Sequence, residues 1–245
     1  MTKYALIPAR SGSQRIGSKN LVMVQGHPLI AYSISRALET GEFSRVIVST
    51  DSEAIREVAL EYGAEVPELR PDSIAQSNSP DIEWVKHALG AWIKCDGDDL
   101  LTILRPTNPL RTCSTISRAL NLASRLKDWD SIRAVRPTKE HPRKMWIENS
   151  KYIEPFLPEI NEITKTESHS SPMQTLQPLL IQDASLEICK ASTIIQLDSL
   201  SGKKVVPFRM PDYEGFDINY SSDLEYLEYL IKEKKVTLSE PKKPL

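Results

Sequence analysis

The sequence predicts an α/β fold with a doubly wound, mainly parallel sheet. Short β-rich runs alternate with amphipathic stretches through the first 135 residues, and in the amphipathic stretches apolar residues recur three and four positions apart. A length of 245 residues with 40% hydrophobic content suits one substantial domain with an appended subdomain. The expected strands are 3–8, 45–49, 100–104 and 131–135, and the expected helices are 29–39, 52–62, 81–93 and 112–126.

The first expected strand runs directly into a small cationic loop, residues 10–20. Glycines and serines there let the backbone approach a ligand closely and point N–H groups at anionic oxygens. Three cations add charge that the backbone dipoles alone do not supply. We interpret the loop as a triphosphate-binding site. Its small residues are Ser11, Gly12, Ser13, Gly17 and Ser18, and its cations are Arg10, Arg15 and Lys19.

The order of residues in this loop argues against two common nucleotide-binding motifs. The Walker motif places Lys before Ser or Thr, whereas here Ser18 precedes Lys19, so a P-loop ATPase or kinase is disfavoured. The loop also lacks G-x-G-x-x-G, which disfavours a Rossmann dehydrogenase. The simplest alternative is a polar turn between two elements, although a mere turn would not need so many cations.

Beyond the core, residues 137–176 are rich in proline, charge and aromatic residues and do not continue the alternation. We expect an inserted arm that acts as a lid or docks on a second subunit, which makes a homodimer the expected assembly. A flexible loop is the alternative, but 145–147 and 152–157 are too apolar to be left in water. The expected domains are a nucleotide-binding core at 1–136, this arm, and a return to the core at 177–245.

The returning segment is expected to hold a strand at 179–189, a helix near 192–200, a strand at 204–209 and a closing helix from about Ser221. Ser221 or Ser222 is the expected cap of that helix. The tail beyond Ser239 is expected to be frayed.

Composition excludes several classes of function. A net charge of −2 and a pI of about 6.1 give no sign of a nucleic-acid surface or a membrane anchor. No apolar run is long enough to span a bilayer, and we expect no cleaved signal before the first strand. The three cysteines, Cys95, Cys113 and Cys189, are widely spaced and resemble reduced thiols. The expected location is the cytoplasm.

Several motifs together resemble the acylneuraminate cytidylyltransferases, which make CMP-sialic acid and related CMP-sugars. The resemblance implies a Rossmann-like nucleotidyltransferase that transfers CMP from CTP to an acidic sugar, a nonulosonic or sialic-acid-like 2-keto acid, and releases pyrophosphate. It also implies Mg²⁺ or Mn²⁺ as cofactor. The motifs are Ile7-Pro-Ala-Arg10, Ser18-Lys19-Asn20-Leu21, Gly26-His-Pro-Leu-Ile-Ala-Tyr32, Val48-Ser-Thr-Asp-Ser52, Arg70-Pro71, Arg105-Pro-Thr-Asn-Pro-Leu-Arg-Thr112 and Gly215-Phe-Asp-Ile-Asn219.

The resemblance assigns roles on the CTP side of the site. Arg10 and Lys19 would grip the triphosphate, Asn20 would lie against the ribose or base, and Arg70 would lie near the cytosine. A surface ion pair is the alternative for Arg70. The CTP-binding set is Arg10, Ser11, Gly12, Ser13, Arg15, Lys19, Asn20 and Arg70, and the catalytic set is Arg10, Lys19 and Asp217.

Asp217 matches the first carboxylate of the family's Asp-x-Asp metal site, and Asn219 replaces the second. One carboxylate with an amide oxygen and phosphate oxygens remains workable for Mg²⁺. A structural role at the start of the last helix is the alternative for Asp217.

The chain departs from the family mainly on the acceptor side. Gln14 stands where a loop Lys is common, and Arg105 stands where the sialic-acid enzymes have Gln. A guanidinium there would suit a carboxylate or another anionic group of the acceptor. The expected acceptor-binding residues are Arg105, Gln174, Gln182 and Asp183.

The segment 182–188 is acidic where the family is neutral. Period-two alternation would place Ala184, Leu186 and Ile188 on the core face of a strand, with Asp183 and Glu187 on the other face. We expect Asp183 to touch the acceptor and Glu187 to be solvated or to support it. Two other functions stay open: nucleotidyl transfer to a different anionic small molecule, and a non-catalytic nucleotide-binding protein.

Overall fold

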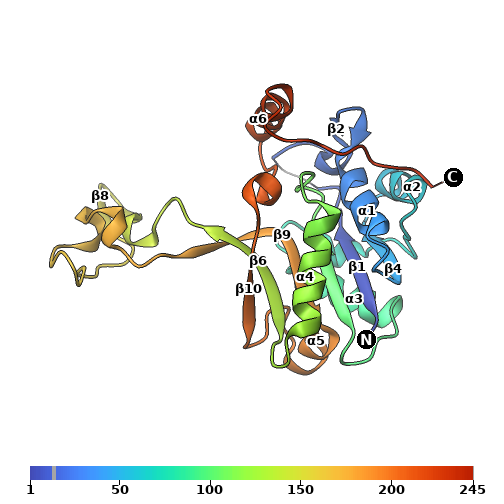
Figure 1. The fold of residues 1–245 in the computed structure, drawn as a ribbon, viewed down its shortest axis with the longest axis horizontal. Coiled ribbons are helices and arrows are strands. Elements are labelled where there is room, and N and C mark those ends of the chain that lie inside the picture. The colour runs from blue at the N-terminus through green and yellow to red at the C-terminus, as the bar shows by residue number, and fades with distance from the viewer. Residues whose placement is uncertain (13–14, 245) are drawn as a thin grey trace. The chain divides into compact units, whose positions relative to one another are not determined.

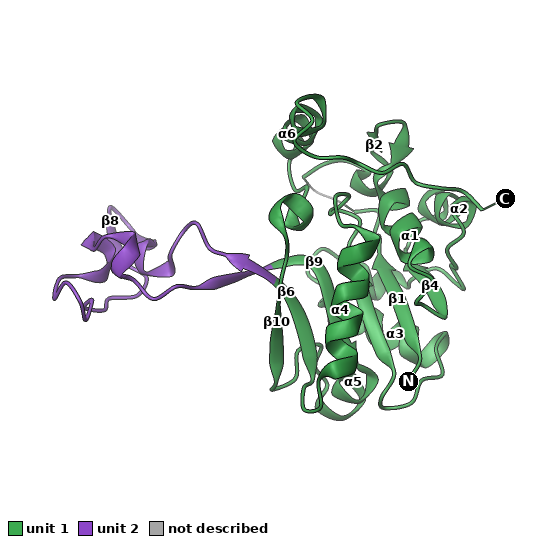
Figure 2. Ribbon diagram, viewed as in Figure 1, with its two compact units in different colours: residues 1–134, 183–245 green, residues 135–182 purple. Residues whose placement is uncertain are grey.

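The computed structural model describes residues 1–12 and 15–244 and divides into two compact units (Figure 2). Unit 1 comprises Met1–Ala134 and the chain from Asp183 onward, and unit 2 is Val135–Gln182. Unit 2 includes the expected arm, 137–176, and extends beyond it at both ends. Its role as a lid or a dimer contact stays a prediction.

Unit 1 is built on a six-stranded sheet with the strand order β10-β6-β9-β5-β1-β4 (Figure 1). β1 pairs in parallel with both β4 and β5, whereas β9 runs antiparallel to β5. The expected doubly wound α/β class is confirmed, with β9 as an antiparallel addition to its parallel strands. The strands are β1 (Lys3–Pro8), β4 (Arg45–Ser49), β5 (Leu100–Leu104), β6 (Ser131–Pro137), β9 (Leu180–Lys190) and β10 (Val205–Arg209).

Helices cover both faces of the sheet because each turns an apolar stripe toward it. One core cluster joins α1, α2 and α4 to the sheet, and a second joins α3 and α5 to the opposite face. Ser52 and Thr112, which the sequence placed inside helices, are instead the caps of α2 and α4. The helices are α1 (Leu29–Glu39), α2 (Glu53–Glu61), α3 (Asp81–Ala91), α4 (Cys113–Arg125), α5 (Ala191–Leu197) and α6 (Ser221–Lys232).

The start of α6 is held differently from the serine cap that the sequence predicted. The Asp223 carboxylate accepts from the backbone N–H groups of Asn219 and Tyr220, each at 2.7 Å. A carboxylate in the first turn satisfies free amide groups and suits the helix dipole, so neither serine is needed. A third apolar cluster packs Leu227 of α6 with Ile218 and Leu29. These contacts fix the segment 217–219.

The expectation of a frayed C-terminus is wrong for residues 239–244, which we call the C-terminal strap. Figure 1 shows the chain after α6 running past α1 to α2. Arg36 Nη2 donates to the carbonyl of Glu240 at 2.9 Å, and the backbone N–H of Lys242 donates to Ser35 Oγ at 2.9 Å. Pro244 lies against Gly63, where φ is +87° and a Cβ would meet the proline ring.

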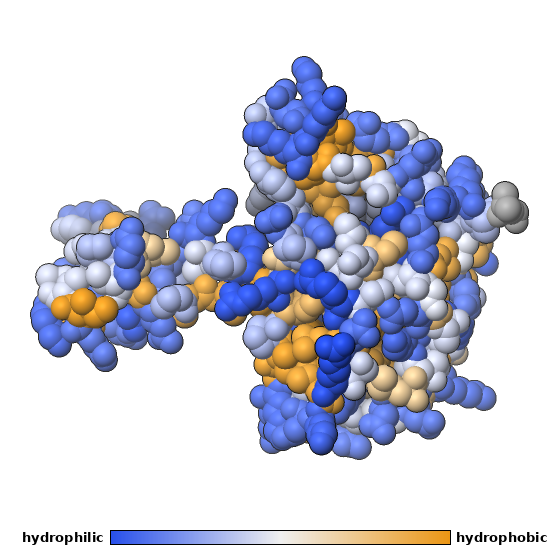
Figure 3. Space-filling model, in the orientation of Figure 1, coloured by the Kyte–Doolittle hydropathy of each residue, from blue (hydrophilic) through white to orange (hydrophobic). Residues whose placement is uncertain are grey.

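Unit 2 contains an antiparallel hairpin of β7 (Trp146–Asn149) and β8 (Tyr152–Pro155), and hydrophobic atoms reach its surface (Figure 3). Tyr152, Ile153 and Ile163 are each at least 60% exposed. A smaller hairpin in unit 1 joins β2 (Met23–Val24) and β3 (His27–Pro28). None of the helices that the structure describes is long and apolar enough to cross a bilayer.

Candidate functional site

A cavity of about 400 Å³ lies beside the residues that follow β1 and β5, within unit 1. Sheets of this class bind ligands beyond the carboxyl ends of their strands, and the volume suits a small molecule. Seven residues that the sequence marked for the site line it: Arg10, Lys19, Asn20, Arg70, Arg105, Asp217 and Asn219. The other lining residues are Pro8, Ile74, Gln76, Ser77, Ser79, Asp81, Trp84, Pro106, Thr107 and Ala184.

Two cations of the loop after β1 face this cavity. Lys19 begins a short 3₁₀ turn, Lys19–Leu21, and its Nζ donates to the carbonyl of Ile218 at 2.9 Å. Asn20 Nδ2 donates to the carbonyl of Arg10 at 3.1 Å, which ties both ends of the loop together. Burial lowers the pKa of Lys19, and the nearby Asp217 carboxylate partly opposes that shift. Ammonium and guanidinium groups so placed suit phosphate oxygens.

Other loop residues expected to bind CTP have protein partners instead. The backbone N–H and the Oγ of Ser11 both donate to the Asp51 carboxylate at 2.7 Å. The Arg15 guanidinium lies 5.1 Å from the centre of the Tyr220 ring. Neither residue, nor Gly12, is among the described residues that line the cavity. Ser13, like Gln14, lies outside the described residues.

Arg70 is buried and lines the cavity, so the alternative of a surface ion pair is wrong. Its Nε donates to Ser49 Oγ at 3.0 Å, and its Nη2 donates to the Ser49 carbonyl at 2.7 Å. The guanidinium also lies 5.3 Å from the centre of the Trp84 ring. Burial lowers the pKa of Arg70 to about 10, so it is still a cation at neutral pH.

Asp217 and Asn219 form one hydrogen-bonded pair at the cavity wall. Asp217 Oδ2 accepts from Asn219 Nδ2 at 2.6 Å, so the amide turns its nitrogen, and not its oxygen, toward the carboxylate. Asp217 Oδ1 is buried and has no hydrogen-bond partner within residues 1–12 and 15–244. An orphaned carboxylate oxygen in a cavity suits a divalent cation. Asn219 is placed to orient Asp217 rather than to add an oxygen ligand beside it.

The described residues contain no group of three or more His, Cys, Asp or Glu side chains that could hold a metal by themselves. Asp217 therefore fits a metal that takes most of its oxygen ligands from a bound nucleotide and water, as Mg²⁺ does.

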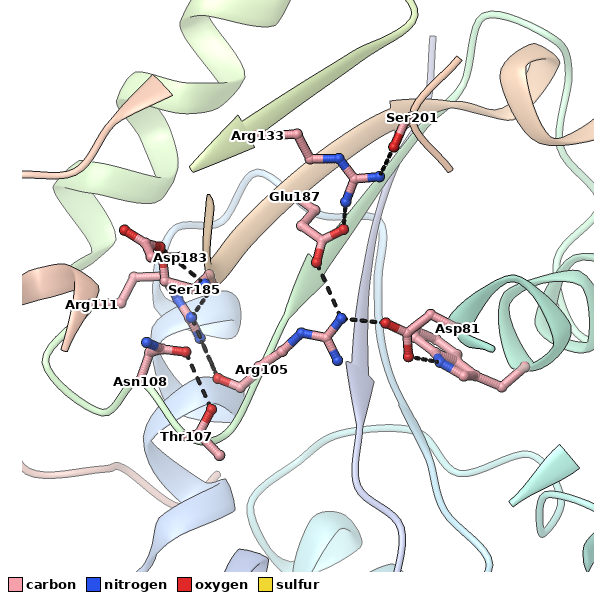
Figure 4. Close-up of polar contacts among 11 residues, drawn as sticks. Asp81, Arg105, Thr107, Asn108, Arg111, Arg133, Asp183, Ser185, Glu187 and Ser201 are labelled. Carbon is pink, nitrogen blue, oxygen red and sulfur yellow. Dashed lines mark hydrogen bonds and ion pairs between the residues drawn. The ribbon is translucent and has the colours of Figure 1, made fainter. Parts of the chain in front are cut away.

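On the acceptor side, Arg105 lines the cavity, but its guanidinium already pairs with two carboxylates of the protein (Figure 4). Arg105 Nη2 forms ion pairs with Asp81 and with Glu187, the latter at 3.1 Å. The residue expected to be solvated or supportive, Glu187, is only 4% exposed, so solvation is wrong. It is the buried partner of Arg105.

Asp183 is not placed as the sequence predicted. It is buried, its Oδ1 accepts from the N–H and the Oγ of Ser185, and it is not among the described lining residues. An added Cβ on Gly215 would lie 2.5 Å from Asp183 Oδ2, so the missing side chain of Gly215 makes room for this carboxylate. Asp183 is therefore not on the wall of this cavity in the structure, and its contact with an acceptor stays a prediction.

The remaining two acceptor candidates, Gln174 and Gln182, belong to unit 2. Gln174 lines a cavity formed within that unit together with Arg143 and Asn161. Their contact with an acceptor stays a prediction.

Sequence reasoning missed the wall formed by the segment before α3 and its first turn. Gln76, Ser77 and Ser79 line the cavity with Asp81 and Trp84. Trp84 Nε1 donates to Asp81 Oδ1 at 2.9 Å. Burial acts to raise the pKa of the Asp81 carboxyl, but Arg105 and Trp84 help to hold that pKa below its usual value. A polar run ending at Pro80, shortly after Arg70-Pro71, was the available signal.

Comparisons with known proteins identify the family of the chain. A family model described as cytidylyltransferase matches residues 4–86. The chain is 30% identical to the post-translational flagellin modification protein B of Campylobacter coli over 94% of this chain and 95% of that protein. It is 31% identical to the CMP-N,N'-diacetyllegionaminic acid synthase of Legionella pneumophila over 95% of this chain and 97% of the relative.

Among solved structures, a CMP:2-keto-3-deoxy-manno-octonic acid synthetase complexed with CTP superposes with a TM-score of 0.68 at 14% identity. The alignment covers 96% of this chain and all of that one, and it supports the fold. The cytidylyltransferase family model and the near full-length similarity to a CMP-sugar synthase identify the protein as a nucleotidyltransferase. The chain belongs to the cytidylyltransferase family, which confirms the resemblance seen in its motifs.

Proposed function

We propose that the protein transfers CMP from CTP to a nonulosonic, sialic-acid-like 2-keto sugar acid and releases pyrophosphate. The observation that carries this proposal is one cavity that unites Arg10, Lys19, Arg70 and Asp217 in a chain of this family. The near full-length similarity to a CMP-N,N'-diacetyllegionaminic acid synthase supports an acceptor of this class.

In the proposed reaction a hydroxyl oxygen of the acceptor attacks the α-phosphorus of CTP. The new P–O bond forms as the bond to the β-phosphate oxygen breaks, pyrophosphate leaves with that electron pair, and the hydroxyl proton passes to solvent. Arg10 and Lys19, which line the cavity, would stabilise the negative charge that develops on the phosphates. Holding the two reactants in line in one cavity supplies much of the remaining rate enhancement.

We propose that Arg70 recognises the cytosine base. Cytosine presents acceptors at O2 and N3, for which a guanidinium is a suitable donor. The two hydrogen bonds to Ser49 fix its orientation before any nucleotide binds. A preordered guanidinium loses little conformational freedom when a nucleotide binds.

Asp217 is the proposed protein ligand of Mg²⁺ or Mn²⁺, supported by Asn219. A divalent cation bound there would neutralise charge on the phosphates. Removing divalent metal with EDTA should abolish turnover, and adding Mg²⁺ or Mn²⁺ back should restore it. Asp217→Ala should raise the metal concentration needed for half-maximal rate by tenfold or more, and Asn219→Ala should raise it less. An unchanged metal requirement in Asp217→Ala would remove this assignment.

The proposed function is tested by incubating the protein with CTP, Mg²⁺ and a panel of 2-keto sugar acids while following pyrophosphate. Release that depends on both CTP and one acid supports the proposal, and UTP in place of CTP is the matched control. If no sugar acid supports release but another anionic small molecule does, the acceptor class is wrong. Tight binding of CTP by calorimetry without any turnover would favour a non-catalytic nucleotide-binding protein.

A further inference from the structure

Four charged side chains of alternating sign form a continuous row beside the cavity (Figure 4). Arg133 comes from β6, Glu187 from β9 and Arg105 from the residue after β5, and these three strands are neighbours in the sheet. Asp81, the first residue of α3, ends the row at the cavity. We call this set the charged row.

The charged row is buried at one end and partly exposed at the end that meets the cavity. The side chains of Glu187 and Arg133 are 5% and 8% exposed, whereas those of Arg105 and Asp81 are 23% and 38% exposed. Ser201 Oγ accepts from Arg133 at 2.9 Å and anchors the buried end, and Trp84 anchors Asp81 at the other end. Two cations and two carboxylates leave the row without net charge.

Glu187 occupies a position that would normally be apolar. Glu187 pairs with Ile103 of the neighbouring strand β5. Ile103 belongs to the core cluster that α3 covers, and so does Cys189, which follows Glu187 by two residues in β9. A carboxylate in such a place is costly unless cations meet it. The acidic Glu187 and the unusual Arg105, which look like separate departures in the sequence, are therefore two halves of one contact.

The pairing determines what Arg105 can offer to a ligand. Its Nη2 is shared by two carboxylates, so its charge is largely offset. Its Nε is buried and has no hydrogen-bond partner in the part of the chain that the structure describes, although the residue lines the cavity. A guanidinium in this state remains a directed donor, but it is a poor counter-ion for a second carboxylate.

We infer that Glu187 and Asp81 are positioning residues for Arg105, and that Arg105 recognises a neutral oxygen of the acceptor, a hydroxyl or an amide carbonyl. This inference rests on the proposed function and revises the expectation that Arg105 meets an additional anionic group. It makes the charged row a determinant of acceptor specificity, separate from the residues that hold CTP.

The test compares Glu187→Gln, Arg105→Gln and the double variant, using the sugar acid that the wild-type protein turns over best. Glu187→Gln should raise the KM for that acid about fivefold or more and leave the KM for CTP within about twofold, because only the acceptor wall loses its anchor. The exposed pair of Glu65 and Arg45 supplies the matched control, Glu65→Gln, which should change neither KM.

Two further readouts separate positioning from a general loss of structure. Arg105 and Glu187 share one contact, so the loss of melting temperature in the double variant should be smaller than the sum of the two single losses. The double variant keeps the charged row without net charge, so it should leave the salt dependence of the acceptor KM unchanged between about 0.05 and 0.5 M NaCl if Arg105 is not a counter-ion. A flattened salt dependence would instead identify Arg105 as a counter-ion and overturn the inference.

Equal increases in both KM values, or strictly additive losses in melting temperature, would also overturn the inference. Failure of the wild-type protein to release pyrophosphate with any sugar acid overturns the proposed function instead. The melting cycle still tests the coupling of Arg105 and Glu187 in that case.

Discussion

At the scale of single residues, Asp51 holds the beginning of the loop that we propose binds the triphosphate. Its two hydrogen bonds to Ser11 join the end of β1 to the end of β4, one residue away from Arg10. Each such bond contributes about 1 kcal/mol, so removing both should loosen the loop that presents Arg10. We predict that Asp51→Ala raises the KM for CTP about tenfold.

Asp51→Asn is the matched control variant for Asp51→Ala. Asparagine can still accept from the Ser11 N–H and can donate to Ser11 Oγ, so its KM for CTP should stay near the wild-type value. If Asp51 instead repelled the triphosphate, both variants would lower the KM. That outcome would contradict a bracing role.

Lys19 gives the site a predictable response to pH. Because burial lowers the pKa of Lys19, the ammonium loses its proton at a lower pH than an exposed lysine does. Affinity for CTP should therefore fall as the pH rises toward the ordinary lysine value of 10.5. Calorimetric titration with CTP from about pH 7 to pH 10 would measure this decline.

Lys19→Arg is the matched variant, since arginine keeps its charge over this whole range. Its affinity should change less between neutral and alkaline pH than that of the wild-type protein. Parallel curves for the two proteins would assign the decline to another group.

At the scale of elements, the C-terminal strap stabilises the α1 and α2 layer. Removing residues 239–245 eliminates the hydrogen bonds to Arg36 and Ser35 and exposes the surface around Gly63. We predict a loss of roughly 1–3 kcal/mol, or about 3–10 °C in melting temperature for a chain of this size. Thermal denaturation measures the effect, and the KM for CTP should not change because the strap does not line the cavity.

The exposed ion pair of Lys243 with Glu61 provides the control for the strap. Lys243→Ala should leave the melting temperature nearly unchanged, since such pairs contribute little. A large loss from that single change would show that charge, not the backbone anchors and Pro244, holds the strap.

The elements themselves were predictable because their signal is local. Apolar spacing alone located β1 and α1, whose bounds match those predicted, 3–8 and 29–39. The strap was not predictable in this way. Its partners lie about 200 residues away in the sequence, and a polar tail carries no periodicity from which those partners could be inferred.

The residues of the cavity also differ in whether a local sequence signal marks them. Lys19 and Asp217 were recognised because short motifs carry them, whereas Asp81 was missed because the start of α3 faces the cavity only in the folded chain. Alternation along β9 predicts which residues share a face. It does not reveal that cations stand opposite Glu187 or that Gly215 makes room for Asp183.

At the scale of the whole molecule, we propose that unit 2 docks on a second copy of the chain. Its exposed residues include Tyr152, Ile153 and Ile163, and large apolar side chains that gather at a surface are typical of an interface. We predict a solution mass of twice the chain mass of 27.6 kDa by light scattering. Ile153→Lys combined with Ile163→Lys should shift the protein toward the monomer.

Leu60→Lys, which changes an exposed residue of α2 in unit 1, is the control and should leave the mass unchanged. A monomeric wild-type protein, or a dimer that both sets of changes leave intact, would contradict the proposed interface.

The charged row has a consequence for how this protein diverges from its relatives. Replacing Glu187 alone leaves the buried Arg133 without its carboxylate partner, which is strongly destabilising. Glu187 and Arg133 should therefore be inherited as a unit and exchanged together. A shift in acceptor preference that removes Glu187 from this wall would then require a coordinated double substitution, and lineages with a neutral residue at position 187 should carry a neutral residue at position 133.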